Sequence, residues 1–77
     1  MIRNYAQFGL FSKGKLISSG TIAELQNKAI DEIEKNNNQN YFISCVIFDN
    51  FDDAIEGTRV LSITKNKDDI LIINELL

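Results

Sequence analysis

The chain has no histidine, proline or tryptophan and only one cysteine, Cys45. Without histidine, no Ser-His-Asp or Cys-His arrangement can form, and the commonest general base near neutral pH is missing. A single cysteine excludes an intramolecular disulfide and, with no histidine, a structural zinc site. Cys45 lies in an apolar segment without a cationic sequence neighbour, which is typical of an inert core thiol. We therefore expect no catalytic activity, no cofactor and no metal.

Long hydrophobic runs are also missing, and the N-terminal residues lack the uninterrupted apolar region of a signal peptide. Together with the lone cysteine, this predicts a cytoplasmic protein that contacts no membrane. The 77 residues are expected to form one domain, 1–77. A domain of this size buries only about 60% of its unfolded surface, and such domains often depend on oligomerisation or a bound partner.

Acidic residues are concentrated in one part of the chain. Residues 24–56 carry eight carboxylates against two lysines, a net charge of −6, whereas the remainder carries six basic residues against three acidic ones. This distribution predicts a region that attracts basic partners. The eight carboxylates are Glu24, Asp31, Glu32, Glu34, Asp49, Asp52, Asp53 and Glu56.

Residues 4–20 are predicted to form a β-hairpin, in which Lys13 and Gly14 form a two-residue loop. In that register Leu10 would face Ile17 and Phe11 would face Leu16. Thr21 and Glu24 then have the spacing of a capping box, so a helix should begin at this point. Its apolar stripe at helical spacing comprises residues 22, 25, 29, 30 and 33, and the asparagine-rich residues 36–40 should end it.

The second half of the chain is predicted to form mostly strands. Residues 41–48 are almost continuously apolar and indicate a central strand covered on both faces. Residues 50–57 resemble one or two helical turns with Asn50 as N-cap. Residues 58–64 and 70–74 read as two further strands, although Asp68 or Asp69 could instead cap a short C-terminal helix that runs through Leu77. The expected fold class is α+β, with a mainly antiparallel sheet of four to five strands, one amphipathic helix on one face and the order ββαβ(α)ββ.

One helix can cover only one face of such a sheet, yet the central and last predicted strands are apolar on both faces. Large exposed apolar patches are uncommon on soluble monomers. Three arrangements would cover the second face: the sheet curls over itself, two copies pack face to face, or a different protein docks there.

The acidic turn around residue 50 has three readings. Asp49, Asp52, Asp53 and Glu56 could ligate a hard cation, but their spacing is wrong for an EF-hand and suits the capping of a short helix. The capping reading is favoured over metal binding. An enzyme using a carboxylate pair, such as Asp52 or Asp53 with Glu56, is the least favoured, since a domain this small offers little enclosed volume.

Two aromatic residues, Tyr41 and Phe51, are expected at loop edges beside acidic residues, where they would be free to serve a protein interface, and the other phenylalanines are needed as core. Direct nucleic-acid binding is not expected. The turn lysines Lys13, Lys15, Lys65 and Lys67 are not accompanied by interleaved arginine and aromatic residues.

The leading hypothesis is a small non-enzymatic protein that binds another protein through its acidic surface and occupies a basic surface of the kind that holds nucleic acid. The partner-binding residues would be Asp49, Phe51, Asp52, Asp53, Glu56, Asp31, Glu32 and Glu34. The alternative is a homo-oligomeric accessory or ligand-sequestering module with the sheet face as dimer interface.

As a profile, the chain resembles the small inhibitors encoded by phages and mobile elements, including anti-CRISPR proteins. The resemblance rests on a short, acidic, histidine-free α+β chain that is rich in asparagine, isoleucine and lysine. It implies a non-enzymatic inhibitor of another protein and transfers no individual residue.

Overall fold

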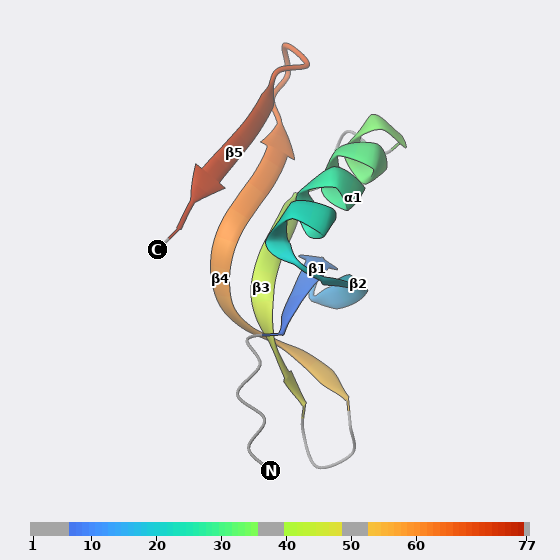
Figure 1. Ribbon diagram of the computed structural model, residues 1–77. Coiled ribbons are helices and arrows are strands. Elements are labelled where there is room, and N and C mark those ends of the chain that lie inside the picture. The colour runs from blue at the N-terminus through green and yellow to red at the C-terminus, as the bar shows by residue number, and fades with distance from the viewer. Residues whose placement is uncertain (1–6, 36–39, 49–52, 77) are drawn as a thin grey trace.

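The computed structural model describes residues 7–35, 40–48 and 53–76, which form one α-helix and five β-strands. The strands make one antiparallel sheet in the order β2-β1-β3-β4-β5, and the helix lies across one face of it (Figure 1). The α+β class and the central place of β3 are therefore confirmed. The elements are β1 (Phe8–Ser12), β2 (Lys15–Gly20), α1 (Ile22–Lys35), β3 (Tyr41–Phe48), β4 (Ala54–Lys65) and β5 (Leu71–Glu75).

The turn between β1 and β2 is the predicted two-residue loop. Lys13 and Gly14 both have positive φ, 55° and 77°, as a type I′ turn requires. Phe11 pairs with Leu16 as expected, but Leu10 pairs with Ser18 and not with Ile17. The prediction for Leu10 was wrong because β2 contains an extra residue at this point, a β-bulge that the loop length alone does not reveal.

Helix α1 begins where the capping box predicts. The Glu24 amide donates to Thr21 Oγ1 at 3.2 Å, and the Thr21 amide donates to Glu24 Oε1 at 3.1 Å. The helix packs its apolar stripe against one sheet face, and this contact forms the core. The core cluster comprises Leu10, Leu25, Ala29, Ile33, Tyr41, Ile43, Leu61 and Ile63.

The predicted second helix is not formed in the described part of residues 50–57. Strand β4 already begins at Ala54, and Ile55 and Glu56 pair with Ile47 and Val46 of β3. The reason is that a β-branched residue such as Ile55 gains a cross-strand partner in the long hairpin. Asn50, Phe51 and Asp52 lie outside the described residues. The last segment is strand β5, so the alternative of a C-terminal helix over residues 71–75 is excluded.

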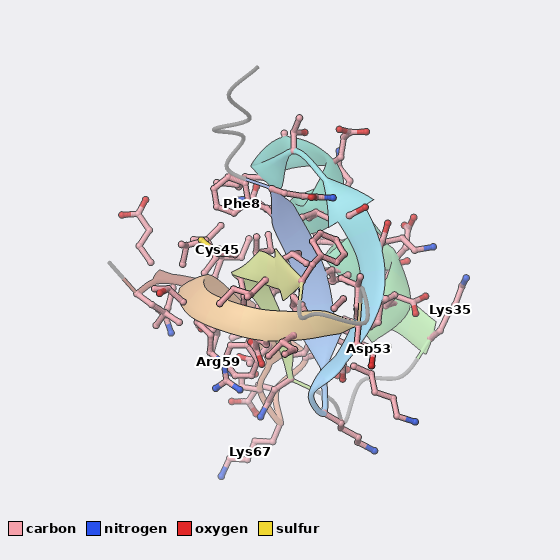
Figure 2. The ribbon with its side chains drawn as sticks, turned by 90° about the horizontal axis from the view of Figure 1, so that it is seen from below. Phe8, Lys35, Cys45, Asp53, Arg59 and Lys67 are labelled. Atoms are coloured by element: carbon pink, nitrogen blue, oxygen red, sulfur yellow. The ribbon has the colours of Figure 1, made fainter. Side chains whose placement is uncertain are left out.

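Strand β4 is bent. Its register with β3 shifts on both sides of the pair Ser44–Arg59, and extra residues of this kind bend a strand and increase its twist. As a result β4 contacts β2, although the two are not neighbours in the sheet. Figure 2 shows the first part of β4 crossing toward β2.

This bend covers part of the second sheet face. Phe11 points away from the helix side and is nevertheless fully buried. At Gly9, an added Cβ would lie 2.5 Å from Leu16 Cδ1 and 2.7 Å from Val46 Cγ2. The side chains of Leu16 in β2 and Val46 in β3 therefore occupy the space that a side chain at position 9 of β1 would need. Of the three covers considered for the second face, curling of the sheet is therefore the one observed around Phe11.

Two predictions for aromatic residues were wrong. Tyr41, expected at an interface, is 1% exposed and belongs to the core, whereas Phe48, expected in the core, is 50% exposed. The cause is the position of α1, which covers the beginning of β3 and leaves its end uncovered (Figure 1). Among the described residues, no helix is long and apolar enough to span a membrane.

Candidate protein-binding surface

The last residues of β3 and the first of β4 form a hairpin arm, defined here as residues 46–48 and 54–56. In Figure 1 the arm extends from the sheet at the end opposite to the C-terminus of α1. The register pairs Val46 with Glu56, Ile47 with Ile55, and Phe48 with Ala54. The arm is therefore a regular antiparallel ladder whose side chains have defined faces.

Large apolar side chains are exposed on the hairpin arm. Ile47 and Ile55 form a cross-strand pair on one face and are 53% and 46% exposed, and Phe48 is 50% exposed. Since successive side chains of a strand point to opposite faces, Phe48 lies on the other face from Ile47. Both faces of the arm therefore offer apolar surface to a partner.

Carboxylates are frequent in the sequence around this apolar surface. Residues 46–57 contain four carboxylates and no lysine or arginine. Asp53 is exposed immediately before β4 (Figure 2), and Glu56 belongs to the arm itself. The other candidates from this stretch, Asp49, Phe51 and Asp52, lie outside the described residues.

A polar network fixes the base of the arm. Ser44 is fully buried, and its hydroxyl donates to Glu56 Oε2 at 2.6 Å. Arg59 Nε donates to the same oxygen at 2.8 Å, and Arg59 Nη2 donates to Glu56 Oε1 at 3.3 Å. The guanidinium carbon of Arg59 also lies 3.8 Å from the centre of the Phe42 ring, a cation–π contact.

The network favours the ionised form of Glu56. Burial raises the pKa of Glu56, but the hydrogen bonds from Arg59 and Ser44 and the charge of Arg59 lower it, and the net pKa is below the ordinary value. Its side chain is 14% exposed, compared with 49% for Arg59. Glu56 therefore contributes mainly to joining β3 and β4, and among the described residues of this end the exposed carboxylate is that of Asp53.

The helix carboxylates form a separate group. Asp31 and Glu34 are exposed and Glu32 is half-buried. Burial and the charge of Glu32 raise the pKa of Tyr41, so Glu32 lies near the first residue of β3. Asp53 and Glu56 lie near the other end of β3, roughly 20 Å away for a strand of this length. The structure thus divides the described residues of the predicted acidic surface between two sites.

An open groove of about 280 Å³ lies between the first half of α1 and strands β4 and β5. Its lining residues are Ile22, Gln26, Val60, Leu61 and Glu75. The polar side chains in this lining are one amide and one carboxylate. The described residues contain no group of three or more side chains that could hold a metal ion.

No family model, curated protein or solved structure matches this chain. Its function must therefore be argued from its own residues. Sequence reasoning missed the exposed Ile47 and Ile55 and the network of Ser44 with Arg59. Two signals were available: Ser44 is the one polar residue within an apolar strand, and Glu56 and Arg59 are of opposite charge and three residues apart.

Proposed function

We propose that this chain is a non-enzymatic protein-binding inhibitor that acts in the cytoplasm on a basic partner, such as a nucleic-acid-binding protein. It would act in the manner of the phage and mobile-element inhibitors that its profile resembles. The hairpin arm is the proposed contact surface. The complete absence of histidine from the sequence agrees with a role that needs no general base.

The observation that carries this proposal is the combination of exposed apolar and acidic groups at one end of the molecule. Ile47, Phe48 and Ile55 are each about half exposed and lie within a stretch that has carboxylates and no basic residue. Protein interfaces typically combine an apolar centre, often with an aromatic anchor, and a polar rim. A rim of carboxylates selects a partner rich in lysine and arginine.

The chemistry of the rim explains how such a protein would inhibit. Carboxylates can accept hydrogen bonds from lysine and arginine side chains that otherwise bind phosphates. The attraction between opposite charges accelerates association and weakens as salt rises. The apolar side chains would then slow dissociation, because they must be exposed to water again when the complex separates.

The test uses charge reversal at each acidic site. Wild-type protein, the Asp52→Lys/Asp53→Lys variant and the Asp31→Lys/Glu34→Lys variant serve as bait in the lysate of the native host, and captured proteins are identified by mass spectrometry. We expect a basic protein to be captured by the wild type and the helix variant, lost with the Asp52→Lys/Asp53→Lys variant, and released by salt. Phe48→Ala should weaken the same capture with little change in its salt dependence.

The helix variant is the matched control, since it makes the same change of net charge at the other end of β3. Circular dichroism of each variant shows that the fold is intact. If the Asp52→Lys/Asp53→Lys variant captures the basic protein as well as the wild type does, these acids take no part in the contact, and if Phe48→Ala also captures it as well, the hairpin arm is not the contact surface.

A further inference from the structure

Strand β5 is the outer strand of the sheet that the described residues form, and one side of its backbone is unpaired within that sheet. The Leu76 amide donates to the Val60 carbonyl and the Asn66 amide donates to the Ile70 carbonyl, so even-numbered residues point their backbone groups toward β4. Because these directions alternate along a strand, Leu71, Ile73 and Glu75 point their amides and carbonyls outward. The edge thus presents three donors and three acceptors.

This edge has few of the features that commonly prevent strands from pairing: β5 is five residues long and its one charged residue, Glu75, stands at its end. Residues 70–74 contain no proline, lysine or other charged residue, and β5 pairs with β4 in unbroken register. The opposite edge, β2, starts with Lys15, has a bulge and continues with Ser18, Ser19 and Gly20. Charges and bulges protect edges from unwanted pairing, so the protein protects one edge and leaves the other open.

The side chains along β5 are apolar and accessible. Ile70 is 57% exposed, Leu71 38%, Ile73 42% and Leu76 46%. In Figure 1 the outer side of β5 faces away from α1, so the helix does not block an approaching strand. A partner for this edge must therefore be an extended, largely apolar segment.

We propose that this partner is a second copy of the chain, whose β5 pairs antiparallel with β5 about a two-fold axis through Ile73. In this register Ile73 faces Ile73 of the second copy, Leu71 faces Glu75, and Ile70 faces Leu76. All six outward backbone groups of each β5 then form hydrogen bonds, and no two like charges face each other. The interface is the same patch on both subunits, as two-fold symmetry requires.

The neighbouring register of the β5–β5 pair would be less favourable. An axis through Ile72 would pair only Leu71 with Ile73, and it would place Asp69 opposite Glu75, two like charges. Asp69 also has a φ of 61° and so is not extended. The register through Ile73 therefore joins more backbone groups with less repulsion.

The dimer leaves the hairpin arm accessible. The arm lies at the end of β3 where β4 begins, whereas β5 pairs with the second half of β4, residues 61–65. A dimer would carry two arms, and two arms on one particle can bind a partner with repeated basic sites more tightly than one arm.

Cysteine cross-linking tests the register in the full chain. Ile73→Cys is made in a Cys45→Ala background, so that it carries the only thiol, and is oxidised at dilute concentration. We expect rapid formation of a disulfide-linked species of twice the 8.7 kDa chain mass, because facing residues in an antiparallel pair lie within disulfide reach. The control is Ile17→Cys in the same background, which is on the β2 edge and similarly exposed.

A second measurement does not depend on oxidation. Sedimentation equilibrium should show self-association of the wild type that is at least tenfold weaker in Ile73→Lys and unchanged in Ile17→Lys. A wild type that remains monomeric to millimolar concentration overturns the proposal, as does equal cross-linking of Ile17→Cys and Ile73→Cys. Should Ile73→Lys fail to fold, the comparison of the two cysteine variants decides.

Discussion

The buried hydroxyl of Ser44 donates a 2.6 Å hydrogen bond to the carboxylate of Glu56, which lies on the neighbouring strand. This pairing depends on the irregular register of β4, which places Arg59 directly opposite Ser44 and Glu56 opposite Val46. Glu56 can therefore accept from both Ser44 and Arg59. The network fixes the bend of β4, and this bend brings β4 to β2 and gives the hairpin arm its direction.

Removal of the Ser44 hydroxyl should destabilise the fold. Ser44→Ala is expected to lower the free energy of unfolding by about 1–3 kcal/mol, because a buried hydrogen bond to a charged group is lost. Urea unfolding measures this loss. Ser19→Ala, at an exposed position of β2, is the control and should stay within about 0.5 kcal/mol of the wild type.

The lowered pKa of Glu56 predicts acid sensitivity. Since the pKa is lower in the folded than in the unfolded chain, the unfolded state binds more protons in acid. Glu56 thus stabilises the fold above its ordinary pKa of about 4.3, and this contribution is lost as pH falls through the folded pKa.

Glu56→Gln should therefore reduce the loss of stability below about pH 4.3, as measured by urea unfolding between pH 6 and pH 2. Glu34→Gln controls for the removal of one exposed carboxylate. The pKa of Glu24 is also lowered, by its backbone and side-chain hydrogen bonds with Thr21, so some acid sensitivity should remain. An identical pH profile for Glu56→Gln and the wild type would contradict the role given to this carboxylate.

Gly9 should not tolerate a larger residue. Gly9→Ala would place a Cβ 2.5 Å from Leu16 Cδ1 and 2.7 Å from Val46 Cγ2, and overpacking of this kind costs about 1–3 kcal/mol. Leu16 can rotate away, but the β-branched Val46 is stiff. Adding Val46→Ala should therefore recover part of the loss. If both single losses simply add in the double variant, the two sites do not touch in the way described.

The parts of the fold that sequence predicted correctly depend on neighbours along the chain. The capping box at Thr21 and Glu24 determines where α1 begins, and Lys13-Gly14 determines the first turn. Each signal is contained in two to four residues. The apolar stripe of α1 was likewise read correctly, because Leu25, Ala29 and Ile33 are buried by helical spacing alone.

The errors arise where distant residues decide the outcome. Ile55 and Glu56 suit a capped helical turn locally, yet pairing with Ile47 and Val46 makes them a strand. Tyr41 and Phe48 stand at the two ends of one apolar strand, and only the position of α1 determines which is buried. For the same reason the division of the acidic residues between two ends of the molecule follows from the fold and not from their order in sequence.

Removal of the N-cap of α1 should lower the free energy of unfolding modestly. Thr21→Ala removes the acceptor of the Glu24 amide and is expected to lower the free energy of unfolding by about 1 kcal/mol. Thr21→Ser keeps the hydroxyl and should retain most of the stability. Denaturant unfolding of both variants checks this, and an unchanged midpoint for Thr21→Ala would contradict the assigned start of α1.

The turn between β1 and β2 should be improved by one substitution. Lys13 has a φ of 55°, a conformation that costs an ordinary L-residue about 1 kcal/mol or more and that asparagine adopts more easily. Lys13→Asn creates the Asn-Gly pair preferred in type I′ turns and is expected to raise the free energy of unfolding by about 0.5 kcal/mol. Lys67→Asn removes the same charge from the exposed loop before β5 and controls for the loss of charge.

Lys13→Val should lower the free energy of unfolding, since a β-branched side chain is strained at positive φ. Equal midpoints for Lys13→Asn and Lys13→Val in urea would show that this turn does not impose the conformation described.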